Sequence, residues 1–294
     1  MTTSKHLRED TDSADPYIFN NAEYEERRRV DQQSHALNTL LHDAPIHAPV
    51  SNLRGILEIG HGTGLMTTLL GRKFPQAKVY GIDPSLTPIG FHAKPDNVEY
   101  IQGRYEDLLE SKDVRLQLAS FDYIFVRMAV CWVVDWSSHI RRLMSLLKPG
   151  GWMELQDVSL ATHFSNESVD PVDQDWLWAR VVRDVCLASI NASAGLHLQE
   201  RMIEASLRDV KSICYPFCIN QPLPDRPETE PIARYTKEFV PGVVFGLLDQ
   251  YARERYSKRE IQEMKDSSME TAFSDGLSRP VYWKFHVCIG KKAE

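Results

Sequence analysis

The feature that most constrains the fold is a short apolar run that leads into a glycine-rich turn and then into an apolar helix. Residues 56–64 read Ile-Leu-Glu-Ile-Gly-His-Gly-Thr-Gly. Glycine permits positive φ and lets a ligand approach the backbone closely. The N-terminus of the following helix favours a carboxylate or phosphate. This stretch predicts a cofactor site at the end of a buried strand, with a glycine loop that binds no ligand as the structural alternative.

The glycine spacing distinguishes two classes of cofactor. The dinucleotide fingerprint is G-x-G-x-x-G, whereas here the third glycine is Gly64 and Leu65 holds the dinucleotide position. The acidic Glu58, two residues before Gly60, is also foreign to that fingerprint. The spacing therefore argues against a nicotinamide-dependent oxidoreductase, which stays open as an alternative.

Strand-like and helix-like segments alternate through the first half of the chain. We expect strands at 55–59, 78–82, 98–102, 121–127 and 152–158, and helices at 65–74 and 137–147. Short connections between them indicate a parallel sheet covered on both faces. In the second half we expect helices at 171–191, 198–207, 239–251 and from Ser257, which opens a capping box, and strands at 210–217 and 281–289.

Composition excludes several classes of protein. The 294 residues suit one large domain or a domain with an insertion, and the net charge of -7 argues against a nucleic-acid partner. The odd count of five cysteines predicts no disulfide framework, so we interpret Cys214 and Cys218 as buried thiols. We expect no metal site and no membrane span. Residues 1–15 lack a signal-peptide core and predict a disordered tail, which favours a cytoplasmic protein, with the nucleus open.

Further candidate ligand contacts follow the second and third strands. Asp83, before Pro84 at the end of strand two, can accept both hydroxyls of a ribose, although an aspartate in a plain turn is the alternative. After the third strand, Gln102, Arg104 and Tyr105 are placed to meet a base. For Tyr105, an aromatic residue that begins a helix is an equal alternative.

The string E-x-G-x-G-x-G resembles motif I of the class I S-adenosylmethionine-dependent methyltransferases, and residues 147–152 resemble the turn before their fifth strand. Within that class the chain is similar to the LaeA-like methyltransferases of fungal secondary metabolism, which include a gliotoxin thiomethyltransferase. The similarity rests on residues 17–19 and 29–33, a fourth strand ending in Arg127, the run 149–154 and the last strand, 282–292. Between about 159 and 256 it holds only in outline.

The resemblance implies an α/β fold with a Rossmann-like seven-stranded sheet of order 3-2-1-4-5-7-6. It implies an N-terminal helical lid at 16–50, a cofactor-binding core at 51–158, a helical substrate cap with strand six at 159–279, and a final core strand at 280–294.

The resemblance also implies S-adenosylmethionine as the cofactor. The residues expected to hold it are Glu58, Gly60, Gly62, Gly64, Asp83, Pro84, Gln102, Arg104, Tyr105, Arg127, Tyr17 and Arg29. Arg104 stands where the family often has an acidic residue for the adenine amino group, which leaves Gln102, the Tyr105 ring or backbone groups to replace that contact. For Arg127, an ion pair with a carboxylate is the structural alternative.

The acceptor side is less constrained. Met128, Trp132, Trp152 and Tyr24 are expected to line a substrate pocket, although core packing is the alternative for the tryptophans, Trp136 included. His163 and His197 are conceivable bases, but in-line methyl transfer needs a base only when the nucleophile stays protonated. The resemblance implies methyl transfer to O, N or S of a small secondary metabolite. A regulatory member that binds the cofactor and acts through protein partners, and a non-methylating reaction, stay open, as do a monomer and a homodimer.

Overall fold

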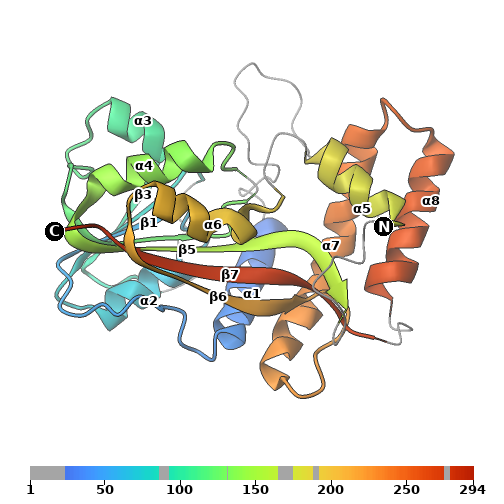
Figure 1. Ribbon diagram of the computed structural model, residues 1–294, viewed down its shortest axis with the longest axis horizontal. Coiled ribbons are helices and arrows are strands. Elements are labelled where there is room, and N and C mark those ends of the chain that lie inside the picture. Colours follow the sequence, from blue (N-terminus) through green and yellow to red (C-terminus); the bar gives the residue numbers. More distant parts are fainter. Residues whose placement is uncertain (1–23, 86–92, 131, 165–174, 188–191, 275–278) are drawn as a thin grey trace.

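The computed structural model describes residues 24–85, 93–130, 132–164, 175–187, 192–274 and 279–294. The expected tail at 1–15 and Tyr17 lie outside these ranges. The described strands form a seven-stranded sheet of order β3-β2-β1-β4-β5-β7-β6, which confirms the predicted order (Figure 1). The strands are β1 (Gly55–Ile59), β2 (Lys78–Asp83), β3 (Val98–Gln102), β4 (Phe121–Arg127), β5 (Leu147–Phe164), β6 (Arg208–Cys218) and β7 (Val281–Lys291).

The five strands from β3 to β5 are parallel, and β7 runs antiparallel between β5 and β6. At the centre, Ile56 of β1 pairs with Val79 of β2 on one side and with Tyr123 of β4 on the other. Nearly every residue of β1 and β4 is buried. Continuous burial is expected of parallel strands whose two faces are both covered.

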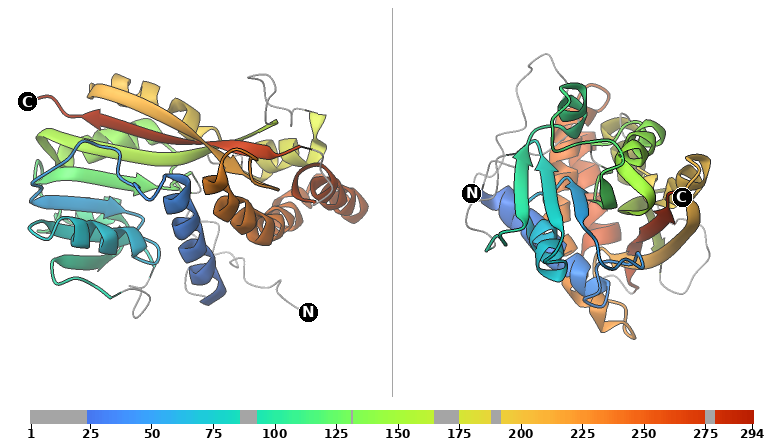
Figure 2. Two further views of the ribbon diagram at one scale, coloured as in Figure 1. Left: turned by 90° about the horizontal axis from the view of Figure 1, so that it is seen from below. Right: turned by 90° about the vertical axis from the view of Figure 1, so that its left-hand side faces the viewer.

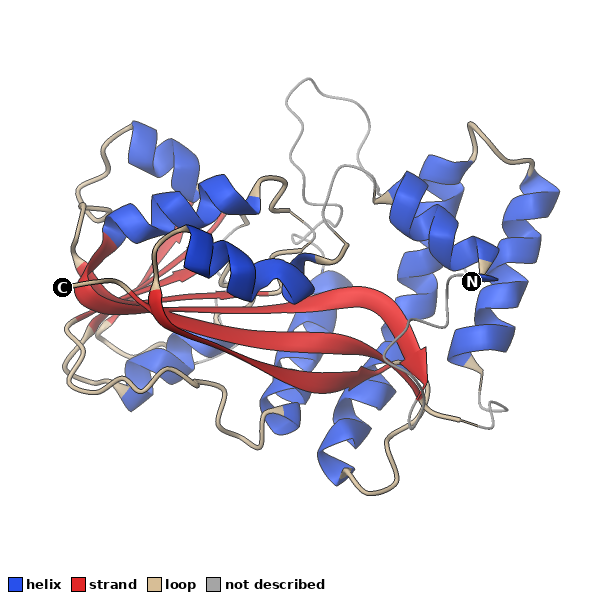
Figure 3. Cartoon of the chain, viewed as in Figure 1, coloured by secondary structure: helices blue, strands red, loops and turns tan. Residues whose placement is uncertain are grey.

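Helices cover both faces of the sheet (Figures 2 and 3). One face carries α1 (Tyr24–Leu40) and α2 (Leu65–Lys73), and the other carries α3 (Tyr105–Glu110), α4 (Trp136–Leu146) and α6 (Ala194–Glu204). Helix α4 shows how the local sequence determines where a helix begins and which of its faces is buried. The Asp135 side chain caps it by accepting from Ser138 N at 2.9 Å, and the stripe of Ile140, Leu143 and Leu146 is buried against the core.

A group of helices, here called the cap, lies largely at one end of the molecule, and part of its helix α7 runs beneath the long strands beside α1 (Figures 1 and 3). Its elements are α5 (Leu177–Val181), the π-helical turn η2 (Val182–Cys186), the short η3 (Pro227–Thr229), α7 (Glu230–Leu247), η4 (Leu248–Ala252), α8 (Lys258–Ser268) and η5 (Met269–Phe273). The capping box predicted at Ser257 is present, because Ser257 and Glu260 exchange both capping hydrogen bonds at the start of α8.

Several element bounds differ from those predicted. Strand β5 continues through Pro149-Gly150-Gly151, which reads as a turn, and it extends to Phe164. Helix α7 begins at Glu230 and tolerates Pro241 in its interior. Part of the helix expected at 171–191 is α5 with its π-helical continuation, and the rest lies outside the described residues. Helix α3 was not among the expected helices, but its start matches the alternative weighed for Tyr105, an aromatic residue that begins a helix.

One expectation about the cysteines was wrong. Cys218 is buried as expected, whereas Cys214 is exposed. Cys214 lies on β6, the edge strand, and residues 208–215 of this strand are exposed or partly exposed. Among the described residues, no helix has both the length and the apolar character that crossing a bilayer requires.

Candidate functional site

The glycine-rich turn adopts the backbone that its sequence predicts. Gly60, Gly62 and Gly64 have φ of 77°, 54° and 79°, a region that L side chains avoid. A Cβ on Gly62 would lie 2.9 Å from Cγ1 of Val30, so only glycine lets α1 pack directly on the turn. Asp31 of α1 also accepts a hydrogen bond of 3.0 Å from the Thr63 hydroxyl. The turn is therefore enclosed from one side by α1.

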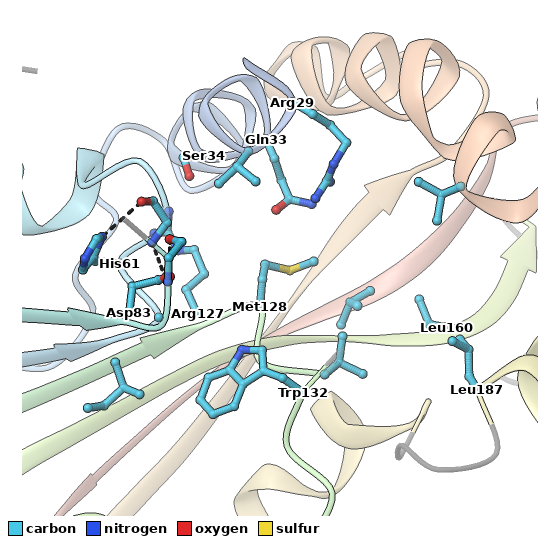
Figure 4. Close-up of a pocket in the computed structure, with 18 of the residues that line it drawn as sticks. Arg29, Gln33, Ser34, His61, Asp83, Arg127, Met128, Trp132, Leu160 and Leu187 are labelled. Carbon is cyan, nitrogen blue, oxygen red and sulfur yellow. Dashed lines mark hydrogen bonds between the residues drawn. The ribbon is translucent and has the colours of Figure 1, made fainter. Parts of the chain in front are cut away.

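A cavity of about 480 Å³ opens beside this turn, at the carboxyl ends of β1 to β4 (Figure 4). Ligands of open α/β sheets bind at this edge. Most of the residues expected to contact a cofactor or substrate lie on its walls. They are Arg29, Glu58, Gly60, Gly62, Asp83, Pro84, Gln102, Arg104, Tyr105, Arg127, Met128 and Trp132.

Asp83, at the end of β2, is hydrogen-bonded to the backbone of the glycine turn. Its Oδ2 accepts from Gly62 N at 2.9 Å, and its Oδ1 accepts from Ser85 N at 2.8 Å and from the Ser85 hydroxyl. Each carboxylate oxygen can accept more than one hydrogen bond. Asp83 thus shapes the turn while keeping acceptor capacity toward the cavity that it lines.

Two buried groups of opposite charge, Glu58 and Arg127, line this part of the cavity. Burial raises the pKa of Glu58 to about 7. The Thr67 hydroxyl, which donates to Glu58 at 2.5 Å, and the charge of Arg127 both lower this pKa and so oppose the effect of burial. Burial lowers the pKa of Arg127 to about 10, opposed first by Glu58. The hydrogen-bond partners of Arg127 among the described residues are the amide oxygens of Gln156 and Asn38, not the carboxylate weighed as an alternative.

Tyr105 begins α3 and is buried, and its ring forms part of the wall. Its hydroxyl is 2.6 Å from Nδ1 of His139. Burial lowers the pKa of His139 to about 3, so this imidazole is neutral. The rings of Trp132 and Trp136 meet His139 edge-on. The Tyr105 hydroxyl is therefore used inside the protein, and its ring is the part left for a ligand.

Beyond Met128 the cavity changes character, as Figure 4 shows between Arg127 and Leu160. Met128 has a φ of 55°, unusual for a side chain of its size, and it stands at the junction of a polar part and an apolar part. We call the apolar part the chamber. Its apolar walls are Val158, Leu160, Trp178, Ala179, Val182, Leu187, Phe217, Val240, Val243, Val244, Leu247 and Trp283.

A few polar groups interrupt the chamber wall. The hydroxyl of Tyr235, on α7, accepts hydrogen bonds from Arg29 and from Gln33, both on α1. Thr162 and Arg183 are further polar residues of the wall. Because α1 and α7 are joined here, α1 and the cap form one continuous wall.

Three residues expected at the site lie elsewhere. Gly64 caps α2 and packs on Tyr100, whose hydroxyl would be 2.4 Å from a Cβ at that position. Trp152 packs against the apolar core beside β1 and α2. Tyr24, the first residue of α1, is 70% exposed. Trp132 lies beside Gly60, where a Cβ atom at the glycine position would be 3.5 Å from the Trp132 ring. Trp136 is buried in the core.

Neither candidate base reaches the cavity wall. Leu160 and Thr162 of β5 line the cavity, so alternation turns His163 to the opposite face, where it stacks on Tyr282 at 5.8 Å between centroids. His197 lies on α6, across the sheet from α1, and is 3.7 Å from Glu200. The placement of both histidines argues against a direct role.

Several wall residues were not singled out from the sequence. His61 lies inside the turn, with its Nδ1 3.1 Å from Gly62 O and its pKa lowered by burial. Ser85 and Glu106 also line the cavity. Ser85 follows Asp83 closely, and Glu106 follows Arg104, so their nearness to expected residues was the available signal. The residues of the chamber carried no motif.

Comparisons with known proteins agree with this geometry. Residues 25–198 match a family described as a methyltransferase domain. The chain is 26% identical over 259 residues to methyltransferase str2 of Strobilurus tenacellus, covering 84% of this chain and 86% of that protein. It is 30% identical to methyltransferase pytC of Aspergillus terreus, covering 60% of this chain but about half, 51%, of pytC.

Two further similarities are more distant. The secondary metabolism regulator laeA of Monascus pilosus is 29% identical over 44% of this chain, which covers 33% of that protein. Among solved structures, a chain in the complex of the Haloferax volcanii Trm112 methyltransferase activator is similar in fold. Its TM-score is 0.52 at 13% identity, with 93% of this chain and 97% of that chain covered.

Proposed function

The chain belongs to the methyltransferase-domain family and is an S-adenosylmethionine-dependent methyltransferase, and on this premise we propose that its acceptor is an apolar small molecule. The acceptor is of the secondary-metabolite kind and is methylated on oxygen, nitrogen or sulfur. The observation that carries this proposal is the chamber. It continues from the cofactor part of the cavity past Met128 and is walled by aliphatic and aromatic side chains.

The residues of the polar part fit the cofactor. Its amino-acid end carries one positive and one negative charge, and Arg127 and Glu58 offer the matching charges beneath the glycine turn. Asp83 is placed for the ribose hydroxyls, and Gln102, Arg104, Glu106 and the Tyr105 ring lie where the base would follow. S-adenosylmethionine supplies a methyl group activated by its sulfonium sulfur.

The residues of this chain contribute position and exclusion of water. Holding both reactants in line for displacement lowers the barrier without a covalent step. Met128 and Trp132, between the two parts of the cavity, limit where an acceptor can stop. The apolar chamber keeps water away from the reacting atoms. Such a chamber beside the cofactor favours catalysis over the regulatory alternative, which would require no acceptor cavity.

A panel of acceptors tests the proposal. The purified chain is incubated with S-adenosylmethionine and four compounds that share one aromatic scaffold and carry a thiol, a phenol, a carboxylate or an amine. Mass spectrometry should detect at least one methylated product. Leu160→Asp, which charges the chamber wall, should abolish it without weakening the binding of S-adenosylhomocysteine measured by calorimetry.

The matched control is Leu118→Asp, at a residue that is 72% exposed and outside the cavity, and it should retain activity. The regulatory alternative would be favoured if the chain binds the cofactor but methylates no member of the panel and its chamber binds no apolar probe.

A further inference from the structure

Arg127 is held by two neutral amides that come from distant parts of the chain. Its Nε donates to Oε1 of Gln156, on β5, at 2.8 Å, and its Nη1 donates to Oδ1 of Asn38, on α1, at 2.9 Å. Its guanidinium also lies 5.3 Å from the centroid of the Phe125 ring. The remaining nitrogen, Nη2, is buried and has no hydrogen-bond partner among the described residues.

We infer that Asn38 and Gln156 are positioning residues that orient Arg127 toward the carboxylate of S-adenosylmethionine without forming a salt bridge with it. This inference rests on the proposed cofactor site. An amide oxygen fixes a guanidinium nitrogen without cancelling its charge, whereas a carboxylate at the same place would form an ion pair with it. Two neutral acceptors therefore hold the group in place and keep it available to an anion.

The orientation of Gln156 is itself determined. Its Nε2 donates to Pro45 O at 2.8 Å and to Oε1 of Glu154 at 2.5 Å. Both amide protons are thus used, and Oε1 must face Arg127, because a flipped amide would lose both bonds. Glu154 is in turn occupied by the Tyr123 hydroxyl at 2.8 Å and by the backbone N–H of Ala48 at 2.9 Å. Because these donors bind the Glu154 carboxylate, it does not form a salt bridge with Arg127.

Asn38 links the lid to the same group. Helix α1 touches the glycine turn through Val30 and through Asp31, and it touches Arg127 through Asn38. Displacement of α1 would remove one of the two acceptors that fix the guanidinium. The closed position of α1 and the binding of the cofactor's amino-acid end are then coupled, each favouring the other.

The test compares two nucleosides that differ at the amino-acid end. Asn38→Ala should weaken the binding of S-adenosylhomocysteine about tenfold or more, the range for a lost hydrogen bond to a charged group. The binding of 5′-methylthioadenosine, which lacks that end, should stay within about twofold. The matched control is Thr39→Ala, because Thr39 neighbours Asn38 and its side chain has no hydrogen bond within the described ranges; it should change neither affinity.

Asn38→Asp separates positioning from mere packing. The carboxylate has the size and the acceptor oxygen of the amide, so a purely structural role would tolerate it. We expect it to lower S-adenosylhomocysteine affinity, because the new charge neutralises Arg127, and to leave 5′-methylthioadenosine affinity unchanged. In an Arg127→Met background, Asn38→Ala should have no further effect on S-adenosylhomocysteine.

Equal losses for both nucleosides, full affinity in Asn38→Asp, or an undiminished effect of Asn38→Ala in the Arg127→Met background would overturn the inference while the proposed function stands. Failure of the unsubstituted chain to bind either nucleoside would overturn the proposed function, and the inference with it.

Discussion

At the end of β1, the Glu58 carboxyl is enclosed by protein, and burial raises its pKa from 4.5 to about 7. Asp157, on β5, is raised to about 7 for the same reason. A carboxyl with a raised pKa in the folded state favours folding only while it is protonated. Its contribution is therefore complete below about pH 4.5 and is lost as the pH rises through about 7.

Glu58→Gln should remove the part of this pH dependence that Glu58 causes. The amide keeps an oxygen for the Thr67 hydroxyl but cannot ionise. We expect the free energy of unfolding, measured with urea between pH 5 and 8, to fall less steeply than in the unsubstituted chain. At pH 8 the variant should be more stable by ~1–3 kcal/mol, because one pKa unit corresponds to about 1.4 kcal/mol.

Asp157→Asn should act in the same direction, and Glu263→Gln, at an exposed residue, should leave the slope unchanged. Identical slopes in the Glu58→Gln variant and the unsubstituted chain would contradict the assignment of a raised pKa to Glu58.

Two glycines should respond in opposite ways to alanine. Gly62→Ala forces a side chain into positive φ, at 54°, and against Val30, so it should lower the free energy of unfolding by at least about 1–2 kcal/mol. Gly242→Ala places a methyl group within α7 where nothing lies within 4 Å, so it should stabilise by about 0.5–1 kcal/mol. Thermal unfolding measures both, and a stable Gly62→Ala would show that α1 does not rest on the turn.

Single residues also show where sequence reasoning ends. The turn glycines and Asp83 could be predicted, because a local motif determines their backbone and spacing. Asn38, His139 and Gln156 could not be predicted, because their roles come from partners far away in the sequence. The face on which His163 lies could not be predicted, because it depends on the register of the strand, which a lone histidine does not reveal.

Among the elements, α1 and α7 together line one side of the cavity. They are joined by Tyr235, which accepts from Arg29 and Gln33, and by an ion pair of 3.0 Å between Arg28 and Glu238. The ion pair is exposed and contributes little. The hydroxyl of Tyr235 is buried with its donors partly buried, so it is the stronger link.

Tyr235→Phe should loosen α1 from the cap. The substitution leaves two donors of α1 without their acceptor, which costs about 1–3 kcal/mol. Hydrogen exchange should therefore become faster across Tyr24–Leu40 and stay unchanged in α2. Arg259→Ala, which removes an exposed ion pair on α8, is the control and should not affect α1. Unchanged exchange in α1 after Tyr235→Phe would mean that apolar packing alone holds the lid.

Most strands could be predicted, because apolar runs and turn residues alternate regularly up to β4, and the family resemblance implied the strand order. The length of β5 could not, since Pro149, Gly150 and Gly151 read as an end to regular structure. The start of α7 at Glu230 could not be predicted either, because the expected helix covered only 239–251, and Pro241 lies in the interior of α7. Both cases show tertiary packing overriding a local preference.

At the scale of the whole molecule, the cavity is enclosed by parts of the chain that flank the core in sequence. Helix α1 precedes the core strands, and α5, η2 and α7 lie in the insertion between β5 and β7. The positions of these segments could be predicted from the sequence, and their roles as lid and cap stay proposals. The shape of the chamber could not be predicted, because its walls meet only in the folded chain.

The placement of β7 between β5 and β6 has a consequence for synthesis on the ribosome. A nascent chain leaves the ribosome with its N-terminus first. In the described sheet, β6 has no neighbour other than β7. While residues 281–291 are still inside the exit tunnel, β6 must wait with its backbone groups unpaired, although β1 to β5 are already available to fold. Pauses in translation after residue 218 would therefore prolong the exposure of an aggregation-prone edge.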